Sequence, residues 1–274
     1  MISVKNLSFS YGKKRVFEGF NLHIPDGQSC LITGINGVGK STLLRLMAGV
    51  LRPDKGEILY GLPLGPCPKK KIGFISDALS LYESLTVARG IDLHLSSFGI
   101  KAFDDSLLKY LKIDRAQRIK SLSLGQRTLF HLSLVLSTQP AILLIDEIIH
   151  AIDAYLRKFF LDQLIRLLSE RRLTVVMVNL NFHDIEHMVD RVILLRHGEI
   201  AIDENIEDLK DKVKRVVSSS LPKDVPVLSM GRRPDRPDYF VYPFREEYRD
   251  RIEGEVIDLN LTDIVTAFIG GEYV

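Results

Sequence analysis

The stretch Gly34–Thr42, with the sequence GINGVGKST, restricts the fold more than any other part of the chain. It matches the pattern G-x-x-x-x-G-K-[ST] of phosphate-binding loops, and Gly37 adds a further glycine inside the pattern. Glycine lets the backbone curl so that successive N–H groups point at one anion, in conformations that a Cβ disfavours. We therefore expect the residues between Gly34 and Gly39, Asn36 included, to wrap around a phosphate group.

The residues on either side supply the strand and the helix that such a loop requires. Ser29–Thr33 is a short apolar run typical of a buried strand, and the apolar residues of 43–50 repeat at helical spacing. A helix that begins beside the loop directs its N-terminal donors and its dipole at the phosphates. Lys40 supplies a positive charge for the outer phosphates, and the hydroxyl of Ser41, next to Thr42, can ligate Mg²⁺. The sequence thus predicts a site for a nucleoside triphosphate and Mg²⁺.

Composition and charge are those of an ordinary globular protein. The 274 residues suffice for one good core plus an appendage, and 46% of them are hydrophobic. A net charge of +2, without a basic stripe interleaved with aromatic residues, indicates no nucleic-acid partner. No apolar run approaches the ~18 residues of a membrane span, and the N-terminus has no secretion core. We expect a cytoplasmic protein whose membrane role comes through a partner.

Neither the cysteines nor the histidines are spaced like the ligands of a transition metal. Cys30 and Cys67 suggest no disulfide framework, and Cys30 falls within the apolar run before the loop. His94, His131 and His150 form no spaced cluster. We expect these histidines to be structural or surface residues.

The region before the loop alternates with the period of β-strands. Ile2 and Val4 share one phase and Leu7–Tyr11 continues in the other, which indicates a bulge or turn near Asn6. Phe20–Ile24 alternates again and ends at a Pro-Asp-Gly turn. We expect a small, largely antiparallel β subdomain in this region.

After the loop, helical and strand patterns alternate as in a parallel α/β protein. Residues 79–111 and 127–138 have helical periodicity, which predicts an inserted helical subdomain over about residues 78–138. Three continuous apolar runs are typical of buried parallel strands: Ile142–Asp146, Thr174–Val178 and Val192–Leu195. We predict an α/β fold with a phosphate-loop NTPase core and a mainly parallel sheet.

The composition changes towards the C-terminus. Residues 222–237 are rich in Pro and Arg, two alternating stretches follow, and Thr262 is placed to cap a short helix that closes at Gly270. We expect a small C-terminal α+β appendage. The chain then divides into a nucleotide-binding domain of residues 1–211 and an accessory domain of residues 212–274.

Two carboxylates, Asp146 and Glu147, stand at the end of the apolar run that begins at Ile142. The run Ile142–Asp146 places an aspartate at a strand end, where it can hold Mg²⁺ through water. A carboxylate beside the metal and the γ-phosphate is a natural general base for an attacking water. We therefore expect Asp146 to bind the metal and Glu147 to be the catalytic residue.

The order of these motifs is similar to that in the ATP-binding subunits of ATP-binding-cassette (ABC) transporters, over about Met1–Lys210. Five elements carry the resemblance: Tyr11, which matches an adenine-stacking aromatic; the phosphate loop; Leu122–Gln126 (LSLGQ), which resembles the signature LSGGQ with Leu124 for the first glycine; Asp146 with Glu147; and Ala151-Ile152-Asp153, which resembles the loop between paired subunits. The signature makes the resemblance specific, because other phosphate-loop classes do not share it.

The resemblance implies a mechanism. Two cassettes would sandwich two ATP molecules head to tail, so that ATP acts between the subunits and hydrolysis releases them. Residues of the signature and the subunit loop would contact the ATP of the second subunit: Ser123, Gly125, Gln126 and Asp153. The implied partners are a second ABC subunit, identical or different, and a membrane permease that holds the protein at the inner face of the cell membrane.

One segment resembles a particular branch of the family. Ile72–Arg89, IGFISDALSLYESLTVAR, is similar to exporter cassettes, as is the closing segment from about Glu255. The resemblance therefore predicts export. In this segment Asp77 stands where the family usually has glutamine, and a carboxylate can accept from Mg²⁺-bound water but cannot donate to phosphate.

A second departure bears on the rate of hydrolysis. The position of the histidine that senses the γ-phosphate is Leu180, which offers no donor, and His183 follows three residues on. Losing one preorganised donor typically costs about 10²–10³ in rate. Ile148, in place of proline, is a smaller departure. The alternatives are an ATP-dependent dimerising clamp or regulatory cassette that hydrolyses ATP slowly or not at all, or a cassette acting on ribosomes or DNA. Cassettes of the last kind usually carry two cassettes in one chain or a long coiled coil.

Overall fold

The computed structural model describes residues 1–61, 68–76, 79–147, 152–170, 173–178, 185–231 and 237–270. Seven residues discussed above lie outside these ranges: Cys67, Asp77, Ile148, His150, Ala151, Leu180 and His183. The chain divides into two compact units, Met1–Cys30 with Gly39–Asn179 and Leu31–Val38 with Leu180–Val274. The predicted domain boundaries, 1–211 and 212–274, stay a prediction.

The N-terminal strands form the antiparallel sheet that their alternation predicts. Its order is β2 (Lys14–Ile24), β1 (Ile2–Tyr11) and β4 (Lys55–Tyr60). The register of β1 against both neighbours shifts beside Asn6, whose φ is +49°. The bulge predicted from the change of phase is therefore present, and it keeps the apolar side chains of both halves of β1 on the buried face.

The apolar runs predicted as buried strands belong to a second sheet, which has six strands. Their order is β5 (Ile72–Ile75), β6 (Ile142–Asp146), β7 (Thr174–Val178), β3 (Ser29–Thr33), β8 (Arg191–Arg196) and β9 (Glu199–Asn205). β5, β6 and β7 pair in parallel, and β8 and β9 are antiparallel. The run before the phosphate loop was grouped with the antiparallel region, but it belongs to this sheet. Every residue of β3 is buried, as strands covered on both faces require.

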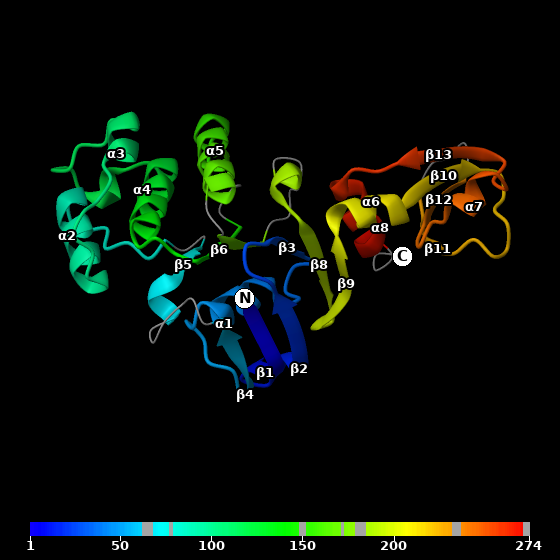
Figure 1. The fold of residues 1–274 in the computed structure, drawn as a ribbon, viewed down its shortest axis with the longest axis horizontal. Helices are drawn as coiled ribbons and strands as arrows, with labels where there is room; N and C mark the ends of the chain where they lie inside the picture. The colour runs from blue at the N-terminus through cyan, green and yellow to red at the C-terminus, as the bar shows by residue number, and fades with distance from the viewer. Residues whose placement is uncertain are drawn as a thin grey trace. The chain divides into compact units, whose positions relative to one another are not determined.

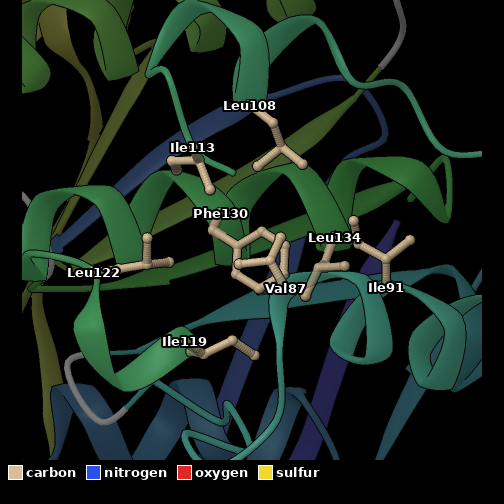
Figure 2. Close-up of a cluster of buried hydrophobic side chains, with 8 residues drawn as sticks. All are labelled: Val87, Ile91, Leu108, Ile113, Ile119, Leu122, Phe130 and Leu134. Atoms are coloured by element: carbon tan, nitrogen blue, oxygen red, sulfur yellow. The ribbon is translucent and has the colours of Figure 1, made fainter. Parts of the chain in front are cut away.

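The inserted helices share one apolar core, and Figure 2 shows its eight buried side chains together. The helices are α2 (Val87–Phe98), α3 (Ser106–Tyr110) and α4 (Leu124–Ser137), joined by the short 3₁₀ helix η3 (Ile119–Ser121). Phe130 of α4 is fully buried in this core. α4 begins at Leu124 rather than at Arg127, because Ser123 caps it.

The remaining helices of the first unit flank the strands that carry the motifs. α1 (Lys40–Met47) follows the phosphate loop, and η2 (Pro68–Lys71) precedes β5. α5 (Ala154–Glu170) follows β6 in the chain, and Phe160 and Leu164, four residues apart on one face of the helix, are buried.

The second unit contains the α+β appendage (Figure 1). Besides β8 and β9, the described elements after residue 180 are η5 (Glu186–Met188), α6 (Ile206–Lys212), β10 (Lys214–Ser218), β11 (Val227–Met230), β12 (Asp238–Val241), α7 (Glu246–Arg249), β13 (Gly254–Asp258) and α8 (Leu261–Gly270). The sheet order is β11-β12-β10-β13. α8 begins before Thr262, because the side chain of Asn260 accepts the N–H of Asp263 at 2.9 Å. Among the described residues, no helix has the length and apolar composition needed to span a membrane.

Candidate nucleotide-binding site

The glycines of the phosphate loop adopt conformations that other residues disfavour. The φ angles of Gly34, Gly37 and Gly39 are +139°, +82° and +115°. A Cβ on Gly34 would lie 2.4 Å from the carbonyl oxygen of Leu195, and a Cβ on Gly39 would lie 2.7 Å from Cζ of Phe17. The pattern of glycines therefore reflects both backbone curvature and close packing.

The helix after the loop begins with features suited to an anion. Gly39 is the N-cap of α1, and among the described residues no side chain caps this end of the helix. The first turn contains no acidic residue. The N-terminus of a helix carries unsatisfied N–H groups and a partial positive charge, so this end of α1 favours a phosphate.

Lys40 is buried at the start of α1, beside two carboxylates. Its exposed fraction is 4%. Burial lowers the pKa of Lys40, and the negative charges of Glu147 and Asp146 act in the opposite direction. The two carboxylates therefore lie close enough to act on the Lys40 ammonium, and this proximity brings together the phosphate loop and the end of β6.

Ser41 and Asp146 bring two oxygen atoms together. The Ser41 hydroxyl donates to Oδ1 of Asp146 at 2.8 Å, and Asp146 is only 2% exposed at the end of β6. Mg²⁺ prefers hard oxygen ligands and keeps several of its own waters, so a hydroxyl and a carboxylate at this separation fit it. Asp77, the third predicted ligand, lies outside the described residues.

Glu147 has an unusual backbone. Its φ is +46°, in the left-handed region that non-glycine residues seldom adopt, and its N–H donates to the carbonyl of Val178 at 3.0 Å. Such conformations cluster at functional sites, where the surrounding structure imposes them. The carboxylate of this partly buried residue follows β6 directly, and no sequence signal indicated either the conformation or the bond to β7.

The start of α4 is closed by a reciprocal pair of hydrogen bonds. Ser123 Oγ accepts the N–H of Gln126 at 3.2 Å, and the Ser123 N–H donates to Oε1 of Gln126 at 3.0 Å. The spacing S-x-x-Q is the sequence signal of this capping box. Leu124 lies between them and is 43% exposed.

The next signature residue, Gly125, is buried against the start of α5. A Cβ there would lie 2.5 Å from Cδ1 of Leu156 and 3.6 Å from Oδ2 of Asp153. Oδ1 of Asp153 accepts the N–H groups of Tyr155 and Leu156, at 3.1 Å each. The resemblance gives Gly125 and Asp153 one function, and the two residues lie close together in space within one subunit.

The other predicted nucleotide contacts lie in separate places. Tyr11 ends β1 with 46% of its surface exposed, and its ring packs edge-on against Phe9 with centroids 4.9 Å apart. Asn36 is exposed in the phosphate loop, whereas Thr42 is buried in α1. The structure thus brings together one group around Lys40 and a second group where α4 and α5 begin.

Known proteins match the chain over most of its length. The family described as ABC transporter matches residues 17–150. The aliphatic sulfonates import ATP-binding protein SsuB of Pseudomonas fluorescens (strain Pf0-1) is 34% identical over 219 residues, covering 78% of this chain and 80% of that protein. The chain belongs to the ABC transporter ATP-binding family. The sulfate/thiosulfate import ATP-binding protein CysA of Burkholderia mallei (strain ATCC 23344) is 30% identical, covering 73% of this chain and 61% of that protein.

Solved structures of ABC proteins have the same fold. The ATP-binding subunit of an ABC transporter superposes with a TM-score of 0.68 at 21% identity, covering 77% of this chain and 92% of that one. The dimeric bacterial ABC transporter cassette MJ0796 has a TM-score of 0.64 at 26% identity, covering 75% and 99%. These likenesses confirm the predicted α/β phosphate-loop fold.

The family membership decides several of the predictions. It confirms the resemblance and, at the level of the family, the prediction of an ATPase linked to transport. The exporter branch predicted from Ile72–Arg89 is not supported, because the relatives named above are import proteins. The alternative of a slow clamp gains no support from them either.

Proposed function

We propose that this chain is the ATP-hydrolysing subunit of a transporter, that it drives a separate membrane permease, and that ATP acts by pairing it with a second ABC subunit. The observation that supports this most strongly is the group of Lys40, Ser41, Asp146 and Glu147. These residues come from α1 and from the end of β6, and they combine one cation, one metal-ligand pair and one candidate base. A structural role alone would not require this combination in a buried place.

The residues of this group have distinct proposed roles. The phosphate loop, from Gly34 through Asn36, Gly37 and Gly39 to Thr42, holds the phosphates with its N–H groups, and Lys40 neutralises the outer ones. Ser41 and Asp146, together with Asp77, would hold Mg²⁺, which would offset the negative charge that develops on the phosphates. Tyr11 offers its exposed ring to the adenine.

Hydrolysis needs a base for the attacking water. Glu147 is placed next to the metal ligand Asp146 and accepts the proton of that water in our proposal. General base catalysis contributes about 10²–10⁴-fold to a rate. The bond from the Glu147 N–H to Val178 holds the backbone of the base while its side chain remains partly exposed.

Pairing with a second subunit completes each site. We place Ser123, Gly125 and Asp153 against the ATP of that subunit, and the dimeric cassette of the same fold supports such a pair. The partner is a second copy or a related cassette. The permease partner would hold the pair at the inner face of the cell membrane. The names of the relatives favour import over the export that Ile72–Arg89 suggested.

The first test is steady-state ATP hydrolysis by the purified chain with Mg²⁺. We expect turnover in the parent chain, about 10²–10⁴-fold less in Glu147→Gln because the base is lost, and no change in the control Glu57→Gln, an exposed glutamate on β4. Leu180→His tests whether a donor at that position raises the rate. Equal turnover in the parent and in Glu147→Gln would contradict the proposed role of Glu147.

The second readout is ATP-dependent association. Because Glu147→Gln keeps the phosphate loop and the metal ligands but lacks the base, it should bind ATP and remain paired. We expect sedimentation to show monomers without ATP and dimers with ATP and Mg²⁺ in this variant. Lys40→Ala in the same background should stay monomeric at the same ATP concentration.

A further inference from the structure

At the start of α4, the side chain of each polar signature residue accepts the backbone N–H of the other. Oε1 of Gln126 is 3.0 Å from the N–H that it accepts on Ser123, and the N–H of Gln126 donates in turn to the Ser123 hydroxyl oxygen at 3.2 Å. Gln126 is partly buried and Ser123 is exposed. The glutamine side chain is therefore turned back along the chain, towards the serine backbone.

An inventory of donors and acceptors shows what remains for a ligand. A serine hydroxyl has one hydrogen to donate and two lone pairs. One lone pair of Ser123 Oγ is used by the N–H of Gln126, and within the described residues the structure shows no acceptor for its hydrogen. Ser123 can thus donate to an anion without breaking the capping box. Oε1 of Gln126 accepts the Ser123 N–H and has no hydrogen to donate to an anion, so a direct contact with the phosphates would have to come from the Nε2 donors, which the variants below test.

We propose that Gln126 is a positioning residue, which acts on hydrolysis through Ser123 rather than by touching the nucleotide. Its side-chain oxygen holds the Ser123 N–H and so fixes the backbone from which the serine hydroxyl hydrogen points at the outermost phosphate of the ATP on the second subunit. This inference rests on the proposed function, and it changes the role that the family resemblance implied for Gln126. Leu124 is compatible with it, because the capping box uses only positions 123 and 126.

Three variants of the chain separate positioning from direct contact. A capping box accepts Glu as readily as Gln at this position, because either side chain can accept the N-cap N–H. A carboxylate that touched a phosphate would instead repel it. We therefore compare Gln126, Gln126→Glu and Gln126→Ala in the Glu147→Gln background, and titrate ATP with Mg²⁺ to find the concentration that gives half-maximal pairing.

If Gln126 is a positioning residue, the ATP concentration for half-maximal pairing should be lowest with Gln at position 126, higher with Glu and highest with Ala. We expect Gln126→Glu to pair within a fewfold of the parent ATP concentration, and Gln126→Ala to need about 2- to 12-fold more ATP, the range for one lost hydrogen bond. If Gln126→Glu instead needs more ATP than Gln126→Ala, the side chain contacts the phosphates directly and the inference is overturned. Equal values for all three would also overturn it.

A double-mutant cycle excludes a merely structural effect. If Gln126 acts through Ser123, Gln126→Ala should add nothing to the pairing defect of Ser123→Ala, whereas independent contacts would add. Additive effects would therefore overturn the inference. The measurements are made well below the unfolding temperature of each variant. If Glu147→Gln itself never pairs with ATP, the proposed function fails and this inference with it, whereas pairing with the wrong order rejects this inference alone.

Discussion

At two positions of the phosphate loop where φ is positive, glycine is required for different reasons. Gly37, at +82°, has open space where a Cβ would be, so only the backbone conformation requires glycine. Gly34, at +139°, would place a Cβ 2.4 Å from the main-chain oxygen of Leu195. A main-chain atom cannot rotate away as a side-chain tip can, so the second constraint is the stricter one.

Gly34→Ala should therefore destabilise the chain more than Gly37→Ala. A left-handed conformation costs a residue with a Cβ about 1–2 kcal/mol, and this is the loss expected for Gly37→Ala. Gly34→Ala adds the displacement of the Leu195 backbone, so its loss should be larger. Urea unfolding of both variants measures the difference. Equal losses would contradict the contact between Gly34 and Leu195.

At this scale, the sequence identifies residues whose chemistry restricts their type. Lys40 and Asp146 could be assigned from spacing alone, because a phosphate loop and a strand-end carboxylate require those side chains. The left-handed backbone of Glu147 could not, because it depends on a hydrogen bond to Val178 in another strand. The spacing S-x-x-Q also indicates the capping box of Ser123, although the longer LSLGQ motif predicts ligand contacts for the same residues.

Most residues of α4 are buried, and they include polar side chains. Polar residues of α4 are buried beside its apolar ones, and His131 is 8% exposed. Burial lowers the pKa of His131 to about 4, with a smaller contribution from the charge of His94 on α2. The sequence interpretation of these histidines as structural or surface residues agrees with the burial of His131.

The burial of His131 predicts a loss of stability in acid. Below about pH 6.5 the unfolded chain binds a proton at His131 that the folded chain does not bind until about pH 4, so stability falls as pH falls through this window. The full loss is about 3 kcal/mol. His131→Leu should flatten this dependence, and His23→Gln, at an exposed histidine, should not.

The measurement is the free energy of unfolding in urea at a series of pH values from about 7.5 to 4.5. His94 retains a lowered pKa of its own, so a shallower dependence should persist in His131→Leu. The same steep dependence in His131→Leu and in the parent would show that the burial of His131 does not cause it.

Helices and strands with a clear hydrophobic period could be predicted from the sequence. The sheet that a strand joins could not. The phase change near Asn6 located the bulge of β1 correctly, because alternation reports directly on the buried face. A short, mainly apolar run such as Ser29–Thr33 has no alternation, so its pattern cannot show which sheet it joins. The start of α8 was misplaced for a local reason, since Asn260 and Thr262 are both good caps.

At the scale of the whole molecule, the proposed function makes folding depend on ligand. A ligand that binds only the folded chain stabilises it by RT ln(1 + [L]/Kd), which is about 2.7 kcal/mol at 100 times Kd. In the proposal, the phosphate loop with Lys40, Ser41 and Asp146 holds the ATP. ATP should therefore raise the free energy of unfolding of the chain.

Thermal unfolding with ATP and Mg²⁺, with ATP and EDTA, and with AMP tests this expectation. We expect the largest rise in midpoint with ATP and Mg²⁺, because the outer phosphates and the metal together engage Lys40, Ser41 and Asp146. EDTA should lower the rise in the parent, but not in Asp146→Asn, which has already lost a metal ligand. Lys40→Ala should reduce the rise, and Lys109→Ala, at an exposed lysine of α3, should leave it unchanged. An undiminished rise in Lys40→Ala would place the nucleotide elsewhere on the chain.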